Sequence, residues 1–75
     1  MKIRTQDAKR YLDYTETYAD LYGSSGQAAV YTLSSFYPEP VCIGIYEDMN
    51  RAKGVLYEMS LAYQKQERVF SVPAE

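Results

Sequence analysis

Two pairs of carboxylates are the residues in this 75-residue chain whose types and spacing could do chemistry. Glu47 and Asp48 are adjacent, and Asp13 and Glu16 lie close together, so either pair could supply a general acid and a general base. The first pair directly precedes an amphipathic stretch, where aspartate is a favoured N-cap and negative charge suits the helix dipole. The second pair lies in polar strand or turn sequence, where solvated charge is the default. We therefore expect neither pair to be catalytic.

Nucleophilic and metal chemistry have few candidate residues. The chain has no histidine, so its single cysteine, Cys42, has no imidazole that could activate it. One cysteine cannot supply the nitrogen and sulfur ligands of a structural zinc site. Cys42 lies in an apolar run, which predicts a packing residue, and a lone thiol suits a reducing compartment. The sequence thus predicts no enzyme, no metal site and no cofactor.

The charge and length bound the class of protein. The net charge is −2, with basic and acidic residues interleaved, which argues against a nucleic-acid partner. No apolar run approaches the roughly 20 residues of a membrane span, and the first residues lack the apolar region of a signal peptide. We therefore expect a cytoplasmic protein with a single domain over residues 1–75. A chain this short buries only about 60% of its unfolded surface, so a homo-oligomer, most simply a dimer, is expected to add stability.

Alternating patterns predict several short strands. Residues 2–6 alternate with Ile3 and Thr5 on one face. Residues 10–15 and 18–22 are rich in tyrosine and threonine, which favours two strands, although the spacing of tyrosines at 11, 14 and 18 leaves a helix as the alternative. Residues 28–36 alternate again, and a short final strand is predicted near Val69.

The stretch from 41 to 65 predicts a strand followed by a helix. Residues 41–47 are apolar at nearly every position, which indicates a central strand covered on both faces, with Gly44 marking a bulge or the close approach of another backbone, such as the helix. A helix is expected over about 49–65, capped by Asp48. Its apolar stripe comprises Ala52, Val55, Leu56, Met59, Ala62 and Tyr63. The predicted class is α+β: a small, mainly antiparallel sheet of about five strands, one helix on one of its faces and a short last strand.

Two groups of residues are candidates for binding. Gly54, Tyr57 and Leu61 lie off the apolar stripe of the helix, where the small glycine would let another surface approach. Tyrosine is enriched in interface cores, and the chain has nine, of which Tyr18 and Tyr22 are also interaction candidates. The positive side chains that could hold a nucleotide-like ligand are Arg4, Arg10 and Arg51.

Three segments of the chain resemble a group of very small proteins from low-GC Gram-positive bacteria and their phages. They are "MKIRTQDAKRYLDY" at the start, "IGIYEDMNRAKGVLYEM" in the middle and "RVFSVPAE" at the end. The resemblance covers about half of the chain and leaves out residues 16–40. Gly54 and Val72 depart from it, as does the stretch "DMN" after Glu47. It implies a β-rich domain with one helix, in a Gram-positive or phage context, without known catalytic residues.

These observations lead to one expectation and two alternatives. We expect a non-enzymatic binding protein, derived from a phage or prophage, that acts on a bacterial host protein, for example as an anti-CRISPR or other antagonist of bacterial defence. One alternative is an oligomeric protein that sequesters a nucleotide-like small molecule. The other is a structural or accessory protein.

Overall fold

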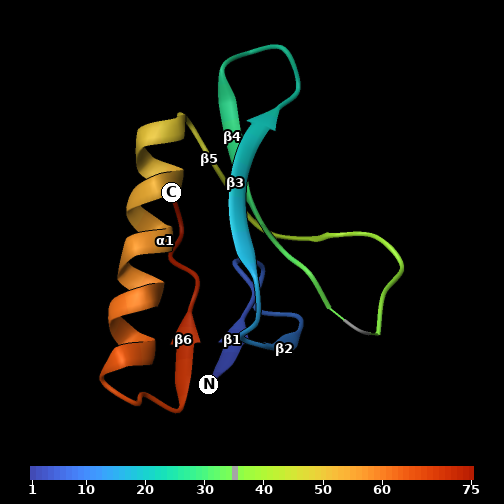
Figure 1. Cartoon of the computed structure of the whole chain (residues 1–75). Coiled ribbons are helices and arrows are strands. Elements are labelled where there is room, and N and C mark those ends of the chain that lie inside the picture. The colour runs from blue at the N-terminus through green and yellow to red at the C-terminus, as the bar shows by residue number, and fades with distance from the viewer. Residues whose placement is uncertain (35) are drawn as a thin grey trace.

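The six strands form two three-stranded sheets rather than one (Figure 1). The computed structural model describes residues 1–34 and 36–75. The elements are β1 (Lys2–Arg4), β2 (Tyr11–Asp13), β3 (Thr17–Tyr22), β4 (Gln27–Thr32), β5 (Val41–Tyr46), α1 (Met49–Gln64) and β6 (Val69–Ser71). The first sheet has the order β2-β1-β6, and the second has the order β3-β4-β5. The predicted α+β class is confirmed, with antiparallel pairing throughout except between β1 and β6, which are parallel.

The tyrosine-rich segment near the N-terminus forms strands, so the helical alternative for residues 10–22 is wrong. Tyrosine and threonine suit the half-buried surface of a pleated sheet. The turn from β3 to β4 contains Gly23 and Gly26 at φ values of 71° and 86°, a region that glycine adopts without steric cost. β4 ends at Thr32, and Ser35, within the stretch predicted as a strand, lies outside the described residues.

The helix α1 begins where the sequence predicted. The Asp48 carboxylate accepts a hydrogen bond of 2.8 Å from the Arg51 N–H, which confirms the cap. α1 packs on one face of the β3-β4-β5 sheet. Ala52, Val55 and Met59 are buried there, as the apolar stripe predicted. Tyr63 was also predicted on that stripe, but it is 55% exposed.

The place of Tyr63 has a simple geometric reason. It lies near the C-terminal end of α1, and its ring contacts Tyr14 with the ring centroids 4.9 Å apart. The two tyrosines therefore pack against each other at the rim of the core rather than inside it.

The prediction that residues 41–47 form the central strand is wrong, because β4 is central and β5 lies at the edge of its sheet. β5 is nevertheless largely buried, because Gln6 covers that edge. The Gln6 N–H donates to the Ile43 carbonyl, and the Gln6 side chain both donates to the Ile45 carbonyl and accepts from the Ile45 N–H. A single glutamine, through its main-chain N–H and its side-chain amide, thus takes the place of a neighbouring strand and joins the two sheets.

Gly44 lies beside a register shift, as expected, but the group that approaches it is not the helix. Val30 pairs with Gly44 and Tyr31 pairs with Cys42, so one residue of β5 is left over as a bulge. A Cβ at position 44 would lie 2.8 Å from the Val72 side chain and 3.1 Å from the Tyr46 ring. The glycine therefore makes room for the C-terminal segment, which packs across β5.

Candidate interaction surface

The β3-β4-β5 sheet has a second face, which points away from α1. Ala19 pairs with Val30, and Val30 belongs to the core beneath the helix. Because successive side chains of a strand point to opposite faces, the next pair, Tyr18 with Tyr31, lies on the other face. Tyr31 in turn pairs with Cys42 on the same side.

We call this the aromatic face. Its members are Tyr18, Tyr22, Tyr31, Cys42 and Ile45, and the exposed Asp20 lies between the two tyrosines of β3. The rings of Tyr18 and Tyr31 are stacked with their centroids 5.3 Å apart and an interplanar angle of 23°. Ala29 lies among them and is fully buried, although α1 covers only the opposite face of the sheet. The tyrosine side chains themselves therefore cover the sheet, and their outer surfaces remain open to a partner.

The aromatic face continues into the loop that follows β4, which swings out on the side of the sheet away from α1 (Figure 1). A groove beside Cys42 is lined by Arg10, Tyr37 and the two prolines, Pro38 and Pro40. The Arg10 guanidinium lies 5.7 Å from the centre of the Tyr37 ring, a cation–π arrangement.

Further aromatic side chains of the same loop region are exposed. Phe36 is 84% exposed, and it lines a second groove together with Tyr11 and Tyr37. Exposed aromatic residues at this density extend the surface that a partner could bury well beyond the sheet itself.

The Tyr31 phenol and the Cys42 thiol stay protonated at neutral pH, although the neighbouring Asp20 brings a carboxylate to the same face. Burial raises the pKa of the Tyr31 phenol. Burial also raises the pKa of the Cys42 thiol, whose sulfur donates a weak hydrogen bond to the Gly44 carbonyl at 3.6 Å. A protonated thiol is a poor nucleophile. The face is therefore suited to apolar and hydrogen-bonding contacts rather than to covalent chemistry.

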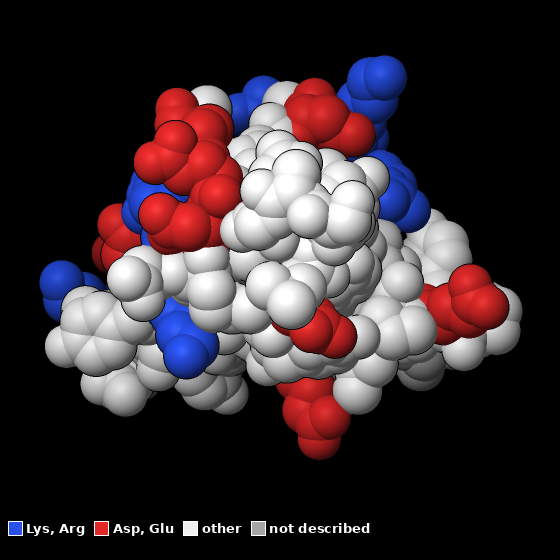
Figure 2. Space-filling model, turned by 90° about the horizontal axis from the view of Figure 1, so that it is seen from above, with Lys and Arg blue, Asp and Glu red and all other residues white. Residues whose placement is uncertain are grey.

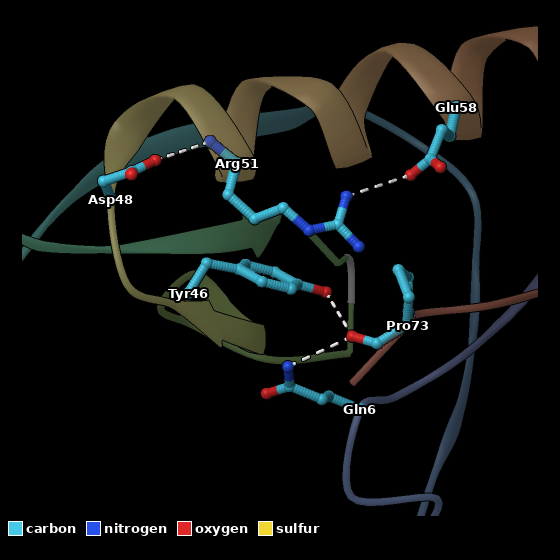
Figure 3. A network of polar contacts seen from close by, with 6 residues as sticks. All are labelled: Gln6, Tyr46, Asp48, Arg51, Glu58 and Pro73. Carbon is cyan, nitrogen blue, oxygen red and sulfur yellow. Dashed lines mark hydrogen bonds and ion pairs between the residues drawn. The ribbon is translucent and has the colours of Figure 1, made fainter. Parts of the chain in front are cut away.

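A polar network on the helix side of the sheet holds the C-terminal segment (Figure 3). The Tyr46 hydroxyl donates to the Pro73 carbonyl at 2.6 Å, and the Gln6 side-chain amide donates to the same oxygen at 3.1 Å. The Arg51 guanidinium lies 5.4 Å from the centre of the Tyr46 ring and pairs with Glu58 at 3.5 Å. Burial raises the pKa of Tyr46 to about 12. Each of these groups has a partner within the chain, so we interpret the network as one that stabilises the fold.

The structure does not bring the three candidate ligand-binding arginines together. Arg51 belongs to the network just described, Arg10 lies against Tyr37 beside the aromatic face, and Arg4 lies exposed on the outer side of β1. Acidic side chains gather beside a broad uncharged area at the end of the molecule where α1 begins (Figure 2). Just before α1, the Glu47 N–H donates to the Glu75 carboxylate, so two acidic residues lie close together there. This end therefore lacks the converging positive groups that would hold an anionic ligand.

The two candidate interaction groups lie on different sides of the molecule. Tyr18 and Tyr22 belong to the aromatic face. Tyr57 is 66% exposed on α1, the space beside Gly54 is open, and Leu61 lies in the groove between α1 and β6. The helix group thus offers one exposed aromatic ring, whereas the aromatic face offers several tyrosines on one side of the sheet.

Within residues 1–34 and 36–75, no group of three or more acidic or cysteine side chains could hold a metal ion. None of the described residues forms a helix long and apolar enough to cross a membrane. Comparisons of the chain with protein-family models, with curated proteins and with solved structures found no match.

Sequence reasoning named Tyr18 and Tyr22 but missed Tyr31, Tyr37 and Phe36. Residues 18, 20 and 22 of one strand pair with residues 31, 29 and 27 of the next, so all six side chains lie on one face. Their sequence positions could have revealed this face only if the register of the hairpin were known. The turn at 23–26 sets that register, because Tyr22 pairs with Gln27.

Proposed function

We propose that this protein is a non-enzymatic binding protein that holds another protein against its aromatic face. The observation that carries the proposal is the set of exposed tyrosines on a sheet face that α1 leaves uncovered. Tyrosine combines a large contact area with a hydroxyl and loses little conformational entropy on binding, which is why it is common among interface hot spots.

The shape and charge of the surface favour a macromolecule over a small ligand. The aromatic face is an open sheet surface with a shallow groove at one side, whereas small-molecule sites enclose most of their ligand. Arg10 is the cation beside it, and it is already placed over Tyr37. A phosphorylated ligand would need several converging positive groups, and Arg4 and Arg51 lie elsewhere.

The sequence resemblance suggests where the partner would be found. In a phage or prophage context the partner would be a host protein in the bacterial cytoplasm, and an antagonist of a defence system such as CRISPR is one concrete form of this function. Small size and open aromatic surface are compatible with an inhibitor that acts by covering a site on its target.

A pull-down with matched variants tests the proposal. Tyr18→Thr with Tyr22→Thr alters the aromatic face while keeping residues that favour strands, and Tyr57→Gln with Leu61→Gln alters the exposed side of α1. Each protein is used as bait in a Gram-positive lysate, and the retained proteins are quantified by mass spectrometry. We expect one host protein to be retained equally by the unmodified protein and the helix variant, and at least tenfold less by the aromatic variant.

Two results would contradict the proposal. One is equal retention of the host protein by the aromatic variant, provided that circular dichroism shows it to be folded. The other is a small molecule that copurifies with the protein in native mass spectrometry and is lost from the aromatic variant, which would favour the sequestering alternative.

A further inference from the structure

The outer edge of β3 is an exposed strand edge six residues long. Among the described residues, β3 pairs with β4 on one side, and no strand pairs with its other side. The outer edge of β5, in contrast, is covered, because Gln6 forms hydrogen bonds with it. The outer strands of the other sheet, β2 and β6, are each only three residues long. An uncovered edge of this length is a ready template for another strand.

The hydrogen-bond pattern shows which main-chain groups of this edge point outward. Leu33 N–H donates to the Glu16 carbonyl at 3.0 Å, so position 16 bonds toward β4. In an antiparallel ladder the bonding direction alternates, so residues 18, 20 and 22 also bond toward β4, and Thr17, Ala19 and Leu21 point outward. The Leu21 N–H agrees with this phase, because it donates to the Asp20 side chain at 2.8 Å instead of to β4.

We propose that two copies of this chain pair antiparallel through the outer edges of β3, about a twofold axis at Ala19. An antiparallel edge is complementary to itself, since each outward N–H can meet an outward carbonyl of the same strand in the second copy. In this register Ala19 faces Ala19 of the second copy, and Thr17 faces Leu21. The pairing forms about six main-chain hydrogen bonds.

The charges select this register over its neighbours. Centring the axis on Asp20 would place the two Asp20 carboxylates directly opposite each other, and centring it on Tyr18 would place Asp20 opposite Glu16. Like charges directly opposite each other destabilise a strand pair. With the axis at Ala19, each Asp20 faces Tyr18 and each Glu16 faces Tyr22 of the second copy, so both carboxylates lie beside phenol hydroxyls that can donate hydrogen bonds.

Side-chain burial supports the same pairing. Leu21 is 64% exposed on the outermost strand, and in the dimer it packs against Thr17 of the second copy. Ala19, the residue on the axis, places only two methyl groups opposite each other across the strand pair. In the single chain the Asp20 carboxylate accepts a hydrogen bond from the Leu21 N–H. In the dimer it would accept one from the Tyr18 hydroxyl of the second copy instead. The Leu21 N–H is then free to pair with the second copy, and the carboxylate keeps a partner.

The dimer has a functional consequence that goes beyond binding by a single copy. Its sheet has six strands, both helices lie on one side, and the two aromatic faces join into one surface on the other. A partner would then meet the tyrosines of both copies. The pairing itself does not depend on the aromatic face being a binding site, so the two proposals can fail separately.

Ala19→Pro tests the edge. Proline removes the outward N–H of residue 19 and leaves the bonds of β3 to β4 in place, because those come from residues 18, 20 and 22. Ala19→Gly is the matched control, since it alters the same side chain and keeps the N–H. Sedimentation equilibrium over a range of protein concentrations should show the 8.6 kDa chain doubling its mass. We expect Ala19→Gly to dimerise and Ala19→Pro to require at least a tenfold higher concentration.

Disulfide exchange tests the register and does not depend on the proline variant folding. Tyr18→Cys and Asp20→Cys are made separately in a Cys42→Ser background, mixed in equal amounts and oxidised slowly. We expect the mixed disulfide between positions 18 and 20 to exceed its statistical share severalfold. A mass that stays at 8.6 kDa at every concentration, a folded Ala19→Pro that dimerises like the unmodified protein, or a statistical mixture of disulfides would each overturn the proposal.

Discussion

Replacing Gln6 by alanine should cost more stability than its partly exposed position suggests. The side chain forms hydrogen bonds with three main-chain groups: it accepts from the Ile45 N–H at 2.9 Å and donates to the Ile45 and Pro73 carbonyls, each at 3.1 Å. Each such bond contributes about 0.5–1.5 kcal/mol net. The loss should therefore be about 2–4 kcal/mol, a large share of the stability of a small domain.

Urea unfolding followed by circular dichroism measures this loss. Gln64→Ala is the matched control, because it removes the same side chain from an exposed position at the end of α1, where a change within about 0.5 kcal/mol is expected. The Ile45 amide should also exchange with solvent faster in Gln6→Ala than in the control. If Gln6→Ala were as stable as Gln64→Ala, the conclusion that Gln6 couples the two sheets would be wrong.

Three further predictions concern the strand–helix unit. Gly44→Ala should lower the free energy of unfolding by about 1–3 kcal/mol, because the new Cβ would lie 2.8 Å from Val72. Gly54→Ala has open space around it and should raise the free energy of unfolding by about 1 kcal/mol. Urea unfolding of both variants measures the two opposite changes. Asp48→Ala should lose about 1 kcal/mol with the helix cap, measured as a lower melting temperature. The pKa of Tyr46 is about 12 in the folded protein and 10 in the unfolded chain, so the free energy of unfolding should fall as the pH rises from 10 toward 12. Tyr46→Phe has no phenol to ionise and should lose less stability over this pH range. Urea unfolding of both proteins between pH 9 and 12 measures the difference.

Local patterns were sufficient for the elements of this fold. The stripe at 52, 55 and 59 and the cap at Asp48 predicted α1, and the alternation of residues 28–36 predicted β4, which spans Gln27–Thr32. Tyrosine and threonine content correctly favoured strands over a helix between residues 10 and 22. These signals reflect how a residue meets its immediate neighbours, which is why they can be read from one sequence.

The arrangement of the elements depends on contacts that no local pattern contains. β5 looked central because it is apolar at nearly every position, yet its outer edge is covered by one glutamine 39 residues away in sequence. Likewise, the bulky neighbour of Gly44 is Val72, which belongs to the C-terminal segment. Contacts of this range are absent from local patterns, so the division into two sheets could not be predicted.

The candidate site was predictable only in part. Tyr18 and Tyr22 stood out as tyrosines, but their partner on the same face, Tyr31, could be assigned only from the hairpin register. The helix group, Gly54, Tyr57 and Leu61, was equally visible in the sequence. Only the structure shows that Tyr18, Tyr22 and Tyr31 share one face of the sheet, whereas the helix group contains a single aromatic ring.

Tyrosine footprinting of the complex tests most directly whether the aromatic face is the binding surface. The protein, free and bound to the host protein retained in the pull-down, is nitrated briefly at equal total concentration, and each tyrosine is quantified by mass spectrometry. Tyr22, 41% exposed, and Tyr57, 66% exposed, serve as the paired readouts. We predict that binding slows the nitration of Tyr22 and Tyr18 severalfold and leaves Tyr57 unchanged. Protection of Tyr57, with Tyr18 and Tyr22 nitrated at the rate of the free protein, would contradict the account.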